Sequence, residues 1–168
     1  MTPAVTLWEL QRRRSLFLQE GWSVVAARHV NVVEELFVLS NRCATGDADA
    51  LAELASAYHD DASIESWLMG EPSTERGAAA VREYFGTVSA YEKWECVLDY
   101  VQDYDGDRVL ALGALRAVQP DSAEHEHAVG WIFTFRGDKV ASVKAYASYG
   151  EALRAATARA PRAHVNTP

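Results

Sequence analysis

"GWIFTFRGDKVASVKAYAS" (Gly130–Ser148) is the stretch that decides the fold. Aromatic and β-branched residues fill both of its halves, and such residues are typical of strands. The segment "RGDK" separates the halves, and its glycine supplies the positive φ that a tight hairpin turn needs. The stretch therefore predicts a hairpin of two long antiparallel strands, at about His125–Arg136 and Lys139–Ser148.

Two further strands are predicted upstream of this hairpin, at about Glu92–Tyr104 and Arg108–Val118. The turn between them, "DYDGD" (103–107), again contains a glycine. Consecutive long strands joined by hairpin turns predict an antiparallel sheet.

Helical spacing dominates the chain before the sheet. From about Ala26 to Cys43, apolar residues recur every three or four positions. Gly46 ends this predicted helix, and Asp47 caps the next one by accepting a hydrogen bond from its free N–H groups. The apolar stripe of the second helix runs as far as Tyr58, and "HDD" (59–61) ends it.

Three more segments complete the prediction. "ASIESWL" (62–68) alternates enough for a short strand, and a loop rich in glycine and proline follows it. "AAAVREYFGTVS" (78–89) is a third helix, and about Gly150–Arg159 is a last one. Helices therefore precede a run of strands, and this order predicts an α+β fold with helices packed on one face of the sheet.

Four segments together carry a resemblance to a known superfamily. "NRCATGDADALAELASAYHDDASIES" (41–66), "RGAAAVREYF" (76–85), the opening stretch and "YGEALRAA" (149–156) resemble the NTF2-like superfamily, and within it the SnoaL-like group. The resemblance covers residues 27–157 and implies a cone-shaped α+β barrel, in which a curved, mostly antiparallel sheet wraps around N-terminal helices and leaves an apolar pocket. It also implies a homodimer. Residues 1–26 are then a helical N-terminal extension, and residues 158–168 are a C-terminal tail.

Composition excludes several classes of function. The 168 residues carry a net charge of −8, which argues against a nucleic-acid partner because phosphate binding needs clustered Lys and Arg. The longest apolar runs are too short for a transmembrane helix, so we expect no membrane partner. Cys43 and Cys96 are far apart in sequence and predict reduced thiols in a cytoplasmic protein, with a disulfide between them as the alternative.

The resemblance allows ketosteroid isomerase, a member of the superfamily, to be aligned with this chain. That enzyme uses a carboxylate base, and a tyrosine and a protonated aspartate hold its enolate oxygen. Here the tyrosine position falls on Leu39, the base on Ser66 and the second aspartate on Trp131. These residues cannot replace the acidic groups, so we expect Leu39, Ser66 and Trp131 to contact substrate, together with Val129 on the face of Trp131.

Two ionisable residues remain as candidates for acid/base catalysis. Glu65 lies one residue from the aligned base position, on the opposite face of its strand. His127 shares a predicted strand face with Trp131 and can act as a base or donor near neutral pH. His125 and His127 lie two apart and could also chelate a metal or form a solvated edge, but no further ligand is evident, so we expect no metal.

Two functional hypotheses follow. The first is a cofactor-independent acid/base enzyme, of cyclase, isomerase or dehydratase type, that acts on an apolar oxygenated metabolite with His127 and Glu65. The second is a non-catalytic domain that binds a small apolar molecule or serves as a dimeric accessory protein. The first predicts an ionisable side chain in the pocket, and the second predicts a pocket without one.

Overall fold

The computed structural model describes residues 24–68, 72–118 and 123–158. The elements follow in the order α2 (Val24–Cys43), α3 (Ala48–Ser56), β1 (Tyr58–Ser66), β2 (Ser73–Arg76), α4 (Ala78–Thr87), the 3-10 helix η1 (Val88–Ala90), β3 (Lys93–Asp103), β4 (Arg108–Val118), β5 (His125–Arg136), β6 (Lys139–Tyr146) and α5 (Tyr149–Thr157). The predicted N-terminal extension lies almost wholly outside the described residues, and so does most of the predicted tail.

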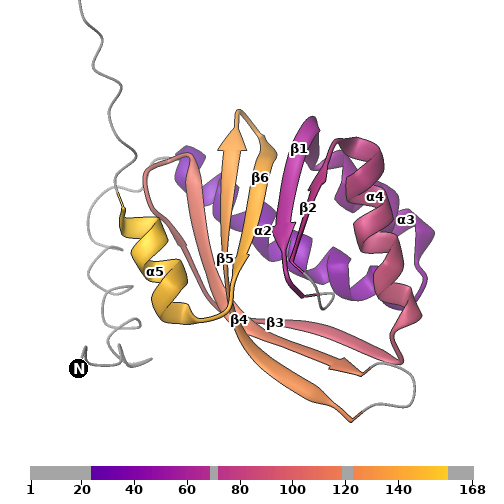
Figure 1. Ribbon diagram of the computed structural model, residues 1–168. Helices are drawn as coiled ribbons and strands as arrows, with labels where there is room; N and C mark the ends of the chain where they lie inside the picture. Colours follow the sequence, from indigo (N-terminus) through magenta and orange to yellow (C-terminus); the bar gives the residue numbers. More distant parts are fainter. Residues whose placement is uncertain (1–23, 69–71, 119–122, 159–168) are drawn as a thin grey trace, which may run out of the picture.

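The described strands form one curved six-stranded sheet in the order β2-β1-β6-β5-β4-β3. All neighbours are antiparallel except β1 and β6, which run parallel. Helix α2 crosses one face of this sheet, while α3 and α4 lie beside β1 and β2 (Figure 1). The α+β prediction is confirmed, as are the two long hairpins that define it.

Side chains of β5 point alternately to the two faces of the sheet, so this strand contributes to two apolar layers. Val129, Trp131 and Phe133 belong to the larger core, between the sheet and α2. Ile132 belongs to a smaller core, which α5 covers on the opposite face. The prediction that the helices share one face is therefore wrong for α5, which crosses to the outer face after β6 (Figure 1).

Gly130 allows α5 to approach the sheet closely. A Cβ atom at this position would lie 2.2 Å from the Cβ of Ala152, which is fully buried in the smaller core. Such a separation is far inside van der Waals contact, so any side chain at position 130 would displace the helix. The glycine in "VGW" is thus a requirement of helix–sheet packing.

Two local predictions were wrong. The predicted second helix extends to Tyr58, but α3 ends at Ser56 and Tyr58 begins β1, where it pairs with Val140 of β6. The loop after β1 contains the short strand β2, whose polar residues Ser73–Arg76 pair with Ser63–Ser66. By contrast, the Asp47 cap is confirmed, since its side chain accepts a hydrogen bond from the Ala50 amide at 2.9 Å.

His29 fastens α2 to both long hairpins. Its Nδ1 lies 2.7 Å from the carbonyl oxygen of Gly106, in the β3–β4 turn, and its Nε2 lies 2.9 Å from that of Gly137, in the β5–β6 turn. Carbonyl oxygens only accept, so both bonds form together only when both ring nitrogens carry hydrogen. The ring is buried and stacks on Phe135 with 4.0 Å between centroids.

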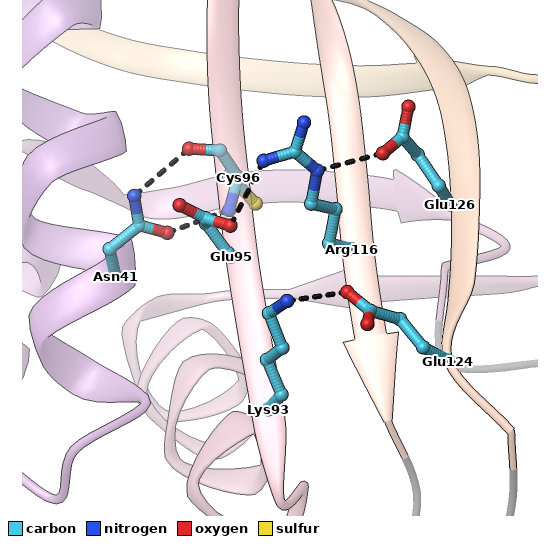
Figure 2. Close-up of polar contacts among 7 residues, drawn as sticks. All are labelled: Asn41, Lys93, Glu95, Cys96, Arg116, Glu124 and Glu126. Carbon is cyan, nitrogen blue, oxygen red and sulfur yellow. Dashed lines mark hydrogen bonds and ion pairs between the residues drawn. The ribbon is translucent and has the colours of Figure 1, made fainter.

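Asn41 of α2 closes part of the exposed edge of β3. Its amide donates to the Cys96 carbonyl at 2.9 Å and accepts from the Cys96 N–H at 2.7 Å (Figure 2). The side chain thus copies the backbone pairing of a neighbouring strand, which protects the edge from unwanted pairing.

The described helices and the two cysteines bear on the membrane and disulfide predictions. None of the described helices has the length and apolar character needed to cross a membrane. Cys43 and Cys96 are both free thiols, so the disulfide alternative is not realised.

Candidate ligand-binding cavity

A cavity lies inside the cone, between α2, α4 and the inner face of the sheet. The cavity volume is about 60 Å³. Its lining comes from α2 (Leu36, Phe37, Ser40), β1 (Tyr58, Ile64, Glu65, Ser66), Leu68, α4 (Tyr84, Phe85), β3 (Trp94, Cys96), β5 (Trp131, Phe133) and β6 (Val143, Ala145).

Aromatic rings form much of the wall. Phe37 meets Trp131 edge to face, with 4.9 Å between ring centroids. Tyr84 and Phe85 of α4 form a second edge-to-face pair at 5.2 Å. Contacts of this kind fix the rings in place and leave an apolar, preformed surface for a ligand.

Ser66 and Tyr84 supply a hydroxyl pair to this wall. The Tyr84 hydroxyl donates to Ser66 Oγ over 2.7 Å, and both side chains are buried. Ser66 Oγ also accepts the backbone N–H of Leu68 at 3.1 Å, where the chain turns out of β1. Burial raises the pKa of Tyr84 to about 12, so its hydroxyl is protonated at neutral pH.

Trp94 and Cys96 point inward from β3 beside this pair. The Nε1–H of Trp94 is buried and has no nitrogen or oxygen acceptor among the described residues. The neighbouring Cys96 sulfur is only a weak acceptor for it. Burial raises the pKa of the Cys96 thiol to about 12, with the Ser40 and Trp94 donors acting in the opposite direction. The thiol is therefore neutral and a poor nucleophile at pH 7.

Glu65 lies in the wall only through its backbone position between Ile64 and Ser66. Ile64 and Ser66 are buried and face inward, so the intervening side chain faces outward. The Glu65 carboxylate pairs with Lys144 Nζ at 2.8 Å, and the two side chains are 45% and 51% exposed. Its charge is thus neutralised on the outer face, away from the cavity.

His127 lies on the inner face of β5, as its spacing from Trp131 predicts, but its side chain is exposed and does not line the cavity. Its ring meets that of Trp67 edge to face at 5.7 Å and stacks on His125 at 6.2 Å. His127 and Glu65 therefore lie on opposite faces, and the structure does not bring them together.

The four predicted contact residues divide into two groups. Ser66 and Trp131 line the cavity. Leu39 is buried in the core and borders a separate hollow beside α3, while Val129 is fully buried without reaching the cavity. Sequence reasoning missed Tyr84, whose signal was its place three residues after Val81 on the inner side of the third helix.

Among the described residues, the cavity contains neither a metal site nor the ion pairs of Arg116. Within 24–68, 72–118 and 123–158, no three His, Cys, Asp or Glu side chains gather closely enough to hold a metal ion. Arg116 of β4 lies on the outer face, where it bonds Glu126 at 2.7 Å and Glu95 at 3.4 Å (Figure 2). It contributes to a surface network and not to the cavity.

Solved structures confirm the fold. A protein from a soil-derived mobile gene cassette, Bal32a, has a TM-score of 0.61 and 19% identity, over 73% of this chain and 90% of its own. SalBIII, described as an epoxide hydrolase/cyclase-like enzyme in pyran ring formation of the polyether salinomycin, has a TM-score of 0.59 and 21% identity, over 74% and 93%.

A third solved structure is a putative polyketide cyclase from Sinorhizobium meliloti, with a TM-score of 0.54 and 19% identity over 69% of this chain and 94% of its own. The comparison with curated proteins found no match. The SnoaL-like domain model matches residues 33–143, about two thirds of the chain, from the middle of α2 into β6. The chain therefore belongs to the SnoaL-like domain family and has an NTF2-like fold.

Proposed function

We propose that this protein binds a small, neutral, largely apolar molecule in the cone cavity. The observation that carries the proposal is the chemistry of the lining: in the part of the chain that the structure describes, the side chains that reach into the cavity are uncharged at neutral pH. A charged ligand would lose its hydration there without gaining an ionic partner, which costs several kcal/mol. Aromatic walls and a few donors suit a neutral molecule instead.

The same lining favours binding over acid/base catalysis. A general acid or base works best with a pKa close to the operating pH. Tyr84 and Cys96 have pKa values raised to about 12, and burial also raises that of Tyr58. Glu65 faces outward, and His127 lies beyond the lining. The second sequence hypothesis, a non-catalytic ligand-binding domain, thus has the stronger support, with Ser66 and Trp131 as ligand contacts.

Catalysis remains a second candidate for a specific reason. The similarity to SalBIII and to a putative polyketide cyclase places enzymes among the proteins of this fold. His127 shares the inner face of β5 with Trp131, so a long substrate extending from the mouth could meet its imidazole. Ring closure or hydrolysis of a neutral epoxy alcohol, lost in His127→Gln but kept in His125→Gln, would support this candidate.

Native mass spectrometry of the purified protein tests the binding proposal. We expect a mass increment from a co-purified neutral molecule that disappears on denaturation. Ala145→Phe, which fills the cavity from β6, should reduce the bound fraction strongly. Ala147→Phe is the matched control, because Ala147 is exposed and lies outside the lining. Equal occupancy in both variants would contradict binding in this cavity.

A further inference from the structure

We infer that Ser66 and Tyr84 select ligands that carry a hydrogen-bond-accepting oxygen, such as a ketone, ester or ether, on an apolar body. The inference rests on the proposed function, because it names the ligand class of the same cavity. The two residues act as one polar contact in an otherwise apolar wall. The sequence offered Ser66 alone, with no indication of its partner on the third helix.

A count of hydrogens supports this assignment. Two hydroxyl groups carry two hydrogens, and the bond between Ser66 and Tyr84 uses one of them. The other has no acceptor within the described part of the chain, whichever residue donates to the other. With Tyr84 as donor, Ser66 Oγ accepts both the Tyr84 hydroxyl and the Leu68 N–H, so its own hydrogen is the free one.

Because the hydroxyl pair is buried, the free hydrogen favours ligands that can accept it. Ser66 and Tyr84 are 7% and 8% exposed, so little water competes for the free donor. A buried donor without a partner costs about 1–3 kcal/mol, and an acceptor atom on the ligand removes that cost. A hydroxyl that already accepts a hydrogen bond is also polarised and donates more strongly.

Trp94 provides an independent second donor. Its buried Nε1–H has no nitrogen or oxygen acceptor among the described residues, only the weakly accepting Cys96 sulfur; the residue is 6% exposed and lines the same cavity. Buried donors are nearly always satisfied in folded proteins, so an exception in a cavity wall points to an absent acceptor. Both hydrogens can therefore be donated to an oxygen acceptor on the ligand. A ligand whose polar group can only donate would not satisfy either of them.

Two bicyclic probes of matched shape test the inference: 1-tetralone, which carries a ketone, and tetralin, which does not. In calorimetric titrations we expect 1-tetralone to bind roughly three- to tenfold more tightly than tetralin. Ser66→Ala and Tyr84→Phe should each reduce this preference, and Trp94 should account for what remains. Ser89→Ala and Tyr149→Phe, which remove hydroxyls far from the cavity, should keep the full preference.

The carbonyl stretch of bound 1-tetralone gives a readout that needs only the wild-type protein. We expect its infrared frequency to fall below the value in a hydrocarbon solvent, as hydrogen bonding requires. Equal affinity for both probes, or an unshifted carbonyl band, would overturn the inference and leave apolar binding intact. Failure of both probes to bind at millimolar concentration would overturn the proposed function as well.

Discussion

Glu65 and Lys144 face each other across the parallel strands β1 and β6, with 2.8 Å between carboxylate oxygen and Nζ, on the outer face of the sheet. Among the described lining residues, the pair directs the one carboxylate, that of Glu65, away from the cavity. Proton transfer would need a buried base in the cavity. The polar side chains of the described lining instead carry hydroxyl, thiol and indole groups, which are neutral.

Substitution of Glu65 tests this relationship directly. Because both side chains are about half exposed, Glu65→Gln should change the free energy of unfolding by less than about 1 kcal/mol, as measured by urea denaturation. It should leave the affinity for 1-tetralone unchanged. A large loss of binding, or of any activity found for the protein, would return Glu65 to the catalytic role that its sequence position first indicated.

The contact between Gly130 and Ala152 predicts an asymmetric response to alanine. Gly130→Ala places a Cβ 2.2 Å from Ala152 and should destabilise the protein by about 1–3 kcal/mol, since α5 must shift. Gly86→Ala is the matched control, because its nearest contact in helix α4 would be 3.9 Å away. That variant should be neutral or more stable by up to about 1 kcal/mol. Equal effects in thermal unfolding would contradict the packing described.

His29 should contribute far more stability than its position near the start of α2 indicates. His29→Ala removes the ring's polar contacts with two turn carbonyls and its stacking on Phe135, and should cost about 3 kcal/mol. His59→Ala is the control, because His59 makes a single bond to the Arg136 carbonyl at the surface. Its cost should stay below about 1.5 kcal/mol. Hydrogen exchange should show both hairpin turns loosened only in the His29 variant.

Asp103 gives the stability a pH dependence. Burial raises its pKa, opposed by the Gly106 N–H bond and by His29, while Asp105 and Asp107 raise it further. A raised pKa in the folded state means that ionisation of this carboxyl weakens folding, so its contribution is most favourable at low pH and is lost as pH rises. Asp103→Asn keeps an acceptor for Gly106 and should be more stable than wild type at pH 7.

The advantage of Asp103→Asn should shrink as pH falls through the pKa of the folded carboxyl. Urea unfolding at pH 7 and pH 4 measures this difference. An advantage that grows at pH 4 would contradict the assigned sign, and Asp138→Asn, at an exposed position in the other hairpin turn, serves as the control.

The sheet was predictable because its signals are local. Alternating aromatic and β-branched residues mark β5 and β6, and Gly137 marks the turn between them. Tyr58 was misassigned because it continues the apolar stripe of α3, and pairing with Val140, 82 positions later, decides its state. β2 is polar along its length and becomes a strand only through its pairing with β1.

The site was less predictable because it depends on partners distant in sequence. Ser66 and Trp131 were placed at the cavity by a resemblance between folds, and the structure agrees with that placement. Tyr84 reaches Ser66 across 18 positions and Lys144 reaches Glu65 across 79, so neither contact has a local signature. Alternation placed His127 on the inner face correctly, but it could not tell that the cavity ends before that residue.

The central claim, that the cavity takes neutral molecules, is tested most directly by calorimetric titration with three bicyclic probes of one shape. These are 1-tetralone, 1-aminotetralin, which is a cation at pH 7, and tetralin-1-carboxylate, which is an anion. The account predicts measurable binding of 1-tetralone, at least tenfold weaker binding of both charged probes, and loss of 1-tetralone binding in Ala145→Phe. Tighter binding of either charged probe in the same cavity would contradict it.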